Sequence, residues 1–204
     1  MRSSKSTHLN TDPKYWDERY GTQAFAYGTE PNAFLKSKIS GPVKHGAKAL
    51  CLADGEARNG TYLAQLGYEV TSIDFSPVAK EKAMVLANMR SVKLQYELTD
   101  LNTYQLEVNQ WDLIVSIFYQ PLAEVRQRHY QRVFSALKPE GLFILETKAS
   151  LLETERSRYP GTDELALELH PMKVIFSLES EQHLNEGTYH QGQQRTAQIL
   201  AQKI

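Results

Sequence analysis

The feature that most constrains the fold is an alternation of short apolar runs with amphipathic helical segments. Each run has the length of a buried strand, and most are separated by a stretch with helical spacing. Strands that alternate with helices form parallel sheets with right-handed crossovers. The sequence therefore predicts a doubly wound α/β domain with a mostly parallel sheet. The predicted strands are residues 49–53, 69–73, 94–98, 112–118 and 142–146.

Residues with capping preferences mark the helices between these runs. Asn32 is placed to begin a helix that reaches about residue 39. A helix over residues 59–66 is followed by Gly67, a usual residue just past a helix end. Ser76 precedes Pro77, and proline is favoured at the first helical position because its missing N–H is not needed there. These signals predict three of the connecting helices.

The last third of the chain departs from the alternation. A long helix is expected over residues 121–137, followed by a turn at residues 138–141. Residues 173–178 and 196–201 both have strand character, and the turn at residues 185–188 between them leaves no room for a crossover helix. Two strands joined so closely must be antiparallel. We therefore expect the domain to close with an antiparallel hairpin.

Length and charge limit the class of protein. The 204 residues suit one domain over residues 14–204, which we expect to follow a flexible tail of residues 1–13. The formal net charge of −1 provides no basic field for nucleic acid, and Arg126, Arg128 and Arg132 are interpreted as a solvated helix face. We expect no nucleic-acid partner, and a monomer or homodimer that acts on a small molecule.

Cellular location is predicted from what the sequence lacks. No apolar run approaches the roughly 18 residues of a membrane span, and the first ten residues have no signal-peptide core. Cys51 is the only cysteine and lies in an apolar run, so we expect a buried small side chain and no disulfide. A cytoplasmic protein without membrane contact is the simplest interpretation.

The loop after the first strand carries the clearest functional signal. Gly55 allows the backbone to turn sharply there. Asp74 follows 19 positions later, at the end of the second strand, which is the usual place for an acid that holds ribose hydroxyls. In open α/β sheets ligands bind beyond the carboxyl ends of the strands. The two residues together predict a cofactor that contains adenosine.

The charges of this loop help to choose between adenosine cofactors. Asp54 and Glu56 would repel the pyrophosphate of a dinucleotide, and the glycines of a G-x-G-x-x-G loop are incomplete. S-adenosylmethionine instead carries an ammonium and a sulfonium, which carboxylates favour. The sequence therefore favours S-adenosylmethionine, and a nicotinamide-dependent oxidoreductase is the less favoured alternative.

Several segments resemble one family over about residues 15–203. They are 15–20 (YWDERY), 27–32 (YGTEPN), 50–59, 111–118, 137–141 (LKPEG) and 184–192 (LNEGTYHQG). With these segments the chain resembles bacterial class I S-adenosylmethionine-dependent methyltransferases, similar to the tellurite-resistance and thiopurine methyltransferase group. The resemblance implies a Rossmann-like fold with a seven-stranded, mostly parallel sheet and an antiparallel C-terminal strand. It also implies methyl transfer to a small acceptor, for example a thiol or a metalloid anion.

The resemblance further implies how the cofactor is held. Gly55 and its neighbours would contact the methionine portion, Asp74 the ribose, and Phe75 the adenine. Arg19 and Tyr27 would close over the cofactor, with Arg19 paired to its carboxylate. The residues after the third strand would lie beside the adenine, and those ending the fourth strand beside the methionine. The predicted cofactor-binding residues are Arg19, Tyr27, Ala53, Asp54, Gly55, Glu56, Asn59, Asp74, Phe75, Ser76, Asp100, Leu101, Ser116 and Ile117.

Four positions depart from the family pattern. Ala53 and Ala57 stand where glycine is usual, Cys51 where aspartate is frequent, and Gln120 where histidine is frequent. These departures leave open a protein that retains the fold and the cofactor without turnover.

The sequence assigns no catalytic residue and no metal site. His129 falls on the apolar face of its helix and is expected to be packed, whereas His170 is in a loop that could face the substrate. His183 and His190 flank the hairpin turn, where surface roles are expected. No His or Cys spacing predicts a metal site. Three cations after the fifth strand indicate either an anionic acceptor or solvated charges, namely Arg156, Arg158 and Lys173.

Overall fold

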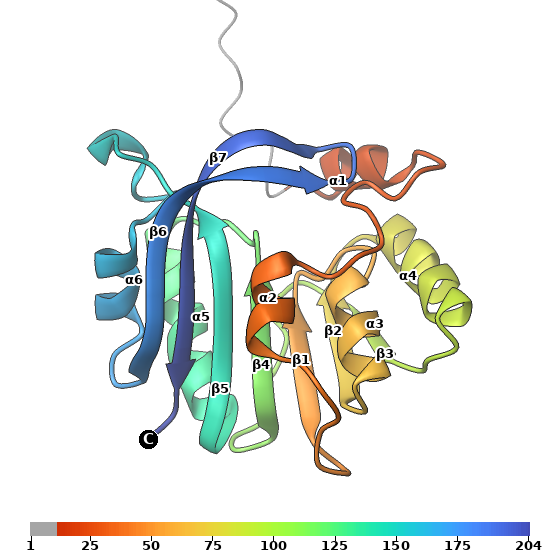
Figure 1. Cartoon of the computed structure of the whole chain (residues 1–204), viewed down its shortest axis with the longest axis horizontal. Helices are drawn as coiled ribbons and strands as arrows, with labels where there is room; N and C mark the ends of the chain where they lie inside the picture. Colours follow the sequence, from red (N-terminus) through yellow and green to blue (C-terminus); the bar gives the residue numbers. More distant parts are fainter. Residues whose placement is uncertain (1–11) are drawn as a thin grey trace, which may run out of the picture.

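Seven strands form one sheet in the order β3-β2-β1-β4-β5-β7-β6 in the computed structural model, which describes residues 12–204 (Figure 1). β7 is antiparallel to both β5 and β6, and the other pairings are parallel. This confirms the predicted α/β class, the closing hairpin and the reversed C-terminal strand. The strands are β1 Lys48–Leu52, β2 Glu69–Asp74, β3 Gln95–Leu98, β4 Trp111–Ile117, β5 Leu137–Lys148, β6 Lys173–Glu186 and β7 His190–Gln202.

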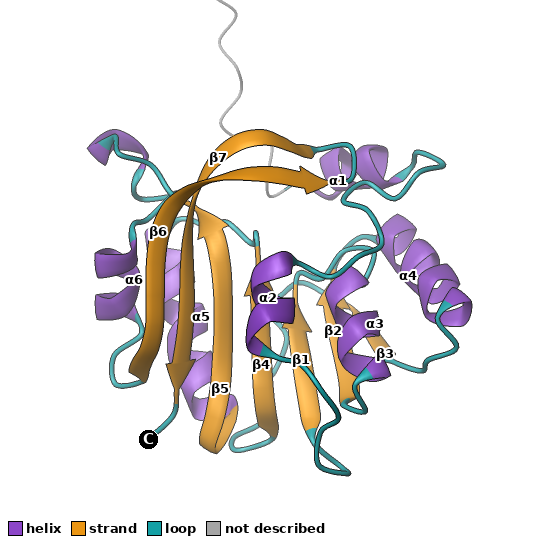
Figure 2. Cartoon of the chain, viewed as in Figure 1, coloured by secondary structure: helices purple, strands orange, loops and turns teal. Residues whose placement is uncertain are grey.

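Helices cover both faces of the sheet (Figure 2). Alternate residues of β1 divide between two cores: Leu50 packs on the side of α5 and α6, and Cys51 packs on the side of α2 and α3. Cys51 is buried, as its apolar run predicts. The helices are α1 Pro13–Tyr20, α2 Ala33–Lys38, α3 Arg58–Gln65, α4 Pro77–Met89, α5 Ala123–Ala136 and α6 Thr162–Glu168, with a 3₁₀ turn, η1, at Glu153–Glu155.

Side-chain caps begin the helices where the sequence places them. Asn32 Oδ1 accepts a hydrogen bond from the Leu35 N–H at 3.0 Å, and Ser76 Oγ accepts one from the Ala79 N–H at 3.1 Å. Asp12 caps α1 in the same way, so α1 begins at Pro13. The end of the expected tail therefore belongs to a helix. The rest of that expectation, residues 1–11, lies outside the described residues.

Three local expectations need correction. The long helix begins at Ala123 rather than at residue 121, and Leu122 is 49% exposed instead of contributing to its apolar face. The expected turn at residues 138–141 is an irregularity within β5: Glu140 has φ +65°, and the register with β4 shifts. The loop expected before His170 contains η1 and α6.

Arg126 is also placed differently from the expected solvated face. Its side chain is 4% exposed and forms two hydrogen bonds of 2.6 Å with the carboxylate of Glu168 on α6. A third bond goes to the Ser157 carbonyl. Because α6 was not predicted, the partner that permits this burial could not be identified from the sequence.

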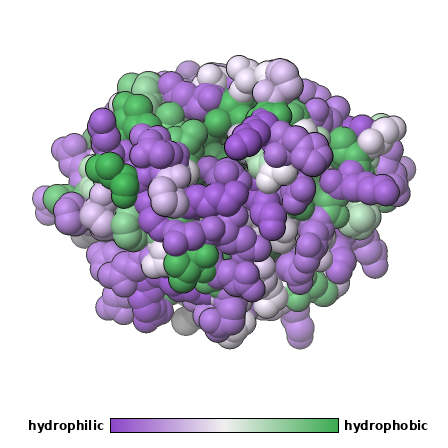
Figure 3. Space-filling model, turned by 90° about the horizontal axis from the view of Figure 1, so that it is seen from below, coloured by the Kyte–Doolittle hydropathy of each residue, from purple (hydrophilic) through white to green (hydrophobic). Residues whose placement is uncertain are grey.

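The surface at the amino ends of the strands is mainly hydrophilic, with small separated apolar areas (Figure 3). No helix within residues 12–204 is long and apolar enough to cross a membrane.

Candidate functional site

The candidate site lies at the carboxyl ends of β1, β2 and β4. β1 is the central of these three strands, and the chain order reverses between β1 and β4. Such a reversal is the place where open α/β sheets bind ligands. The ends of these strands bring together Asp54, Asp74 and Ser116, which are distant in sequence. The predicted cofactor residues of the three strands therefore share one edge.

The loop after β1 turns through three left-handed residues. Ala53, Gly55 and Ala57 have φ values of +49°, +55° and +57°. This conformation costs a residue with a Cβ roughly 1–2 kcal/mol. The two alanines that depart from the family pattern thus adopt the conformation for which glycine is usual. The loop retains its shape at the expense of local strain.

Asp74 is fixed at the end of β2 by backbone N–H groups. Its Oδ2 accepts a hydrogen bond from Gly55 N–H and its Oδ1 accepts one from Ser76 N–H, both at 3.0 Å. Burial raises the pKa of the Asp74 carboxyl, and the hydrogen bonds of Ser76, Gly55 and Phe75 oppose that rise. The carboxylate is therefore oriented by the loop on which a cofactor would lie.

Asp54 holds α3 against β2. Its Oδ2 accepts hydrogen bonds from Gly60 N–H at 3.1 Å and from Ser72 Oγ at 2.7 Å. A Cβ on Gly60 would lie 2.4 Å from Ser72 Oγ and 2.6 Å from Asp54 Oδ2, so this contact requires glycine. Burial raises the pKa of Asp54 to about 7.

Glu56 is engaged by the protein as well. Its Oε2 accepts a hydrogen bond from Ala26 N–H at 2.7 Å, and its Oε1 pairs with Lys82. Burial raises its pKa, and the Lys82 ammonium opposes the rise. With Asp54 also committed, neither loop carboxylate is a free charge. Both are therefore less available to the cations of a cofactor than the sequence indicated.

The segment from α1 to α2 covers this edge. The position of a Cβ on Gly55 would be 2.5 Å from the Tyr20 hydroxyl, and Ser76 Oγ donates a hydrogen bond of 2.5 Å to Asp17 Oδ1. Arg19 donates a hydrogen bond of 2.7 Å to the Tyr27 hydroxyl. Tyr20 and Asp17 of α1 therefore lie against the loops after β1 and β2, whereas the Arg19 side chain is held by Tyr27 within the same N-terminal segment.

The remaining predicted cofactor residues differ in their surroundings. Asn59 Oδ1 accepts a hydrogen bond from Asn32 N–H at 2.9 Å and ties α3 to α2. Ser116 is buried at the end of β4. Leu101 packs into the core below β1, whereas Asp100 is exposed and accepts a hydrogen bond from Asn102 N–H at 2.8 Å.

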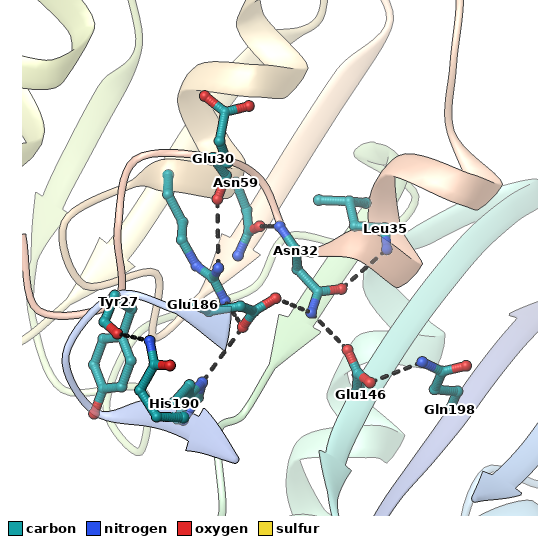
Figure 4. Close-up of polar contacts among 12 residues, drawn as sticks. Tyr27, Glu30, Asn32, Leu35, Asn59, Glu146, Glu186, His190 and Gln198 are labelled. Atoms are coloured by element: carbon teal, nitrogen blue, oxygen red, sulfur yellow. Dashed lines mark hydrogen bonds and ion pairs between the residues drawn. The ribbon is translucent and has the colours of Figure 1, made fainter. Parts of the chain in front are cut away.

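A buried polar network beside the site was not anticipated from the sequence (Figure 4). Glu146 on β5 accepts hydrogen bonds from Asn32 Nδ2 at 2.6 Å and from Gln198 Nε2 at 2.8 Å. Glu186, which ends β6, accepts one from Arg58 at 2.7 Å. Asn32 Nδ2 also lies 3.3 Å from Glu186 Oε1 and joins the two carboxylates. The network connects α2, α3, β5 and the hairpin.

The two carboxylates of the network ionise differently. Burial raises the pKa of Glu146, although the hydrogen bonds of Gln198 and Asn32 favour its charged form. Burial alone would also raise the pKa of Glu186, but His190 and Arg58 outweigh it and bring that pKa to about 2.

His190 occupies the site edge instead of the expected surface position. It is 8% exposed, with its ring centroid 4.5 Å from that of Tyr27 and 4.3 Å from that of Phe118. Its Nδ1 lies 3.4 Å from Glu186 Oε2. Figure 4 shows the two side chains at the hairpin tip. Residues 184–192 were among the segments that carry the family resemblance, but the sequence did not predict that the His190 ring is buried.

The other histidines are away from this arrangement. His129 is buried and lies 3.2 Å from the Tyr119 hydroxyl, as expected of a packed histidine. His183 is exposed, as predicted. His170 does not face the site: it precedes Lys173, the start of β6, which pairs with Gln202 at the opposite edge of the sheet.

The three cations after β5 do not converge. Arg156 pairs with Glu164 on α6 at 3.3 Å. Lys173 begins β6, at the edge of the sheet opposite the candidate site. Within residues 12–204 no three His, Cys, Asp or Glu side chains are grouped to hold a metal ion.

Comparisons with known proteins agree with this geometry. Residues 49–141, from β1 to the irregularity in β5, match the methyltransferase domain family. No curated protein matches the chain. The match supports methyl transfer as the activity of this domain.

Solved structures share the fold at low sequence identity. An S-adenosylmethionine-dependent methyltransferase from Methanosarcina mazei is 16% identical, with 86% of this chain and 99% of that chain covered and a TM-score of 0.66. TehB from Haemophilus influenzae is 21% identical, with coverage of 94% and 67% and a TM-score of 0.67. A protein whose structure concerns conversion of a disulfide into a thioacetal in echinomycin biosynthesis is 14% identical, with coverage of 94% and 92% and a TM-score of 0.70.

Proposed function

We propose that the protein transfers a methyl group from S-adenosylmethionine to a small-molecule acceptor at the carboxyl edge of β1, β2 and β4. The observation that carries this proposal is the pairing of the left-handed loop at Gly55 with the Asp74 carboxylate, joined by a hydrogen bond of 3.0 Å. A tight loop on one strand and an acid on the next strand suit the two ends of an adenosyl amino acid.

The residues of this edge fit such a cofactor. Asp74 is held by three backbone N–H groups, and an ionised carboxylate has about four acceptor sites, so it can still accept from a ribose hydroxyl. Arg19 has no carboxylate partner among residues 12–204, which suits a role in binding the cofactor's carboxylate. Asp54 and Glu56 contribute by holding the loop. When bound, the cofactor supplies an activated methyl group, and the protein has to position the acceptor and exclude water.

A protein that binds the cofactor without turnover is less favoured. That alternative was raised by Ala53, Ala57 and Gln120, and the two alanines retain the left-handed conformation of the loop. Membership of the tellurite-resistance and thiopurine group, the cytoplasmic location and a monomeric or homodimeric state stay predictions from the sequence. The acceptor is proposed only as a small molecule.

Calorimetric titration with S-adenosylmethionine, S-adenosylhomocysteine and NADH tests the cofactor assignment. We expect micromolar binding of both adenosyl ligands and none of NADH. Asp74→Asn should weaken that binding at least tenfold, because it removes the charge that accepts the ribose hydroxyls. Asp163→Asn, at an exposed carboxylate on α6, is the matched control and should bind as the wild type does. Binding of NADH alone, or equal affinities for the two variants, would contradict the proposal.

A further inference from the structure

His190 has the geometry of a proton acceptor at the proposed methyl-transfer site. Its ring lies between Tyr27 of the N-terminal segment and Phe118, the residue that follows β4. The end of β4 belongs to the edge at which β1 and β2 present Gly55 and Asp74. The ring thus lies beside the place where an acceptor would meet the methyl group.

The two ring nitrogens of His190 have different surroundings. Nδ1 faces Glu186 Oε2 at 3.4 Å, and an acid at this position favours a proton on Nδ1. Nε2 forms no hydrogen bond with any residue in the described part of the chain. It is also not among the fully enclosed side-chain nitrogens and oxygens that lack a hydrogen-bond partner in the described part of the chain. Nε2 is therefore open to solvent or to a ligand, with its lone pair free.

The charges that face His190 come from three further elements. Glu186 ends β6, Arg58 begins α3 and Lys148 ends β5. Arg58 is paired with Glu186, but Lys148 has no carboxylate partner among residues 12–204, and Arg19 adds a second unpaired cation near it. An acceptor that becomes negative as it loses its proton is favoured by these cations. An amine, which becomes positive on methylation, is not.

We propose that His190 is the general base for an un-ionised O–H or S–H acceptor and that Glu186 is its positioning residue. This inference rests on the proposed methyl transfer. The acceptor's oxygen or sulfur forms a bond to the methyl carbon while the bond from that carbon to the sulfonium sulfur breaks, and its electron pair stays on the sulfur. The acceptor's proton moves to Nε2, and the resulting imidazolium later releases it to water.

The ionisation of His190 agrees with this role. Burial lowers its pKa, as do the charges of Arg58 and Lys148, whereas Glu186 opposes them. The ring is therefore neutral at pH 7 and able to accept a proton.

Nuclear magnetic resonance of the free protein with labelled histidine gives a readout that needs no cofactor. We expect His190 to carry its proton on Nδ1 at pH 7 and to titrate below 6.5. In Glu186→Gln the preference for Nδ1 should be lost. Exposed His183 in the same hairpin is the internal control, and its ring resonances at pH 7 should be the same in both proteins. A charged His190 at pH 7, or a proton on Nε2, overturns the inference.

Activity with two thiol substrates then distinguishes base catalysis by His190 from a structural role of that residue. Dithiothreitol is largely protonated at pH 7, whereas 5-thio-2-nitrobenzoate is already ionised. His190→Gln should lower kcat/KM for dithiothreitol about 100-fold or more. The same variant should keep kcat/KM for 5-thio-2-nitrobenzoate within about threefold of the wild-type value. The matched variant His183→Gln should change neither rate. Glu186→Gln should move the acid limb of the pH profile for dithiothreitol, which a purely structural role would not do.

The outcomes distinguish this inference from the proposed function. If the wild-type protein fails to bind S-adenosylmethionine in calorimetry, the proposed function fails. If it binds the cofactor but methylates neither thiol, or only the ionised one, the inference is overturned. Equal loss of both rates in His190→Gln, with an unchanged melting temperature and cofactor affinity, also overturns it.

Discussion

Gly187 at the tip of the β6–β7 hairpin lies directly against Gly28 of the N-terminal segment. A Cβ on Gly187 would be 2.3 Å from the Gly28 backbone nitrogen, and the Thr188 N–H donates a hydrogen bond of 2.9 Å to the Ala26 carbonyl. Two segments that are about 160 positions apart therefore meet backbone to backbone, and Figure 1 shows the hairpin tip beside the loop that follows α1.

This contact predicts that Gly187→Ala destabilises the protein more than Gly192→Ala. Both glycines have positive φ, at +62° and +86°, so both variants incur the left-handed cost of roughly 1–2 kcal/mol. Only Gly187 has backbone atoms in the way; nothing lies within 4 Å of a Cβ on Gly192. We expect an additional loss of about 1–3 kcal/mol for Gly187→Ala in urea unfolding. Equal losses would show that the two segments do not pack as described.

Lys82 of α4 is predicted to hold the N-terminal segment in place. Its ammonium pairs with Glu56 and donates hydrogen bonds to the carbonyls of Tyr20, Thr22 and Ala24. Lys82→Met should leave the buried carboxylate uncompensated and cost about 2–4 kcal/mol. Amide hydrogen exchange should rise in residues 13–27 before the sheet exchanges.

The matched control for that prediction is Lys80→Met on the same helix, which removes a side chain that makes no hydrogen bond or ion pair with the described residues. Its unfolding free energy should stay within about 0.5 kcal/mol of the wild type. If Lys82→Met leaves amide exchange in residues 13–27 at the wild-type rate, Lys82 does not hold the N-terminal segment in place.

The buried ion pair between Arg126 and Glu168 is predicted to contribute more to the stability of the protein than a surface ion pair does. Arg126→Met should cost about 3–5 kcal/mol, because it leaves Glu168 charged in a largely buried position. Lys138→Met breaks the half-exposed pair with Asp112 and should cost less than about 1 kcal/mol. Thermal or urea unfolding of the two variants checks the contrast, and similar losses would place Arg126 on the solvated face that its sequence suggested.

Glu186 should make stability depend on pH in the acid range. Its pKa is about 2 in the folded protein and near 4.5 in an ordinary environment. A lowered folded-state pKa stabilises the protein above the unfolded pKa, and this contribution is lost as pH falls toward the folded value. Glu186→Gln should be less stable than wild type at pH 7, by up to about 3 kcal/mol, and the difference should narrow from pH 4.5 downward.

Urea unfolding at pH 3 to 7 measures this difference. Glu181→Gln, at an exposed carboxylate on the same strand, is the control and should show no such trend. A difference for Glu186→Gln that is constant across the range would mean that Glu186 is not held by Arg58 and His190.

Most of the strands, the helix caps and the position of the cofactor loop were predictable from the sequence. Ser76 and Asn32 cap helices through N–H groups three residues away, and the buried strands appear as short apolar runs. Gly55 and Asp74 were predicted to face one edge, because strand ends in a parallel sheet meet there. These features depend on residues that are close in sequence or on the order of the strands, so one sequence is enough to predict them.

The environment of the charged and titratable side chains was decided by the tertiary structure. Arg126 and His190 were both expected at the surface, and both are buried. Arg126 pairs with Glu168 of α6, 42 positions away, and the His190 ring packs against Tyr27 and Phe118, which are distant in the chain. The loop carboxylates likewise have distant partners: Ser72 is 18 positions from Asp54, and Ala26 is 30 positions from Glu56. The burial of a charge depends on whether a distant partner offsets its desolvation. The local pattern cannot report this, because it records the spacing of residues and not their partners.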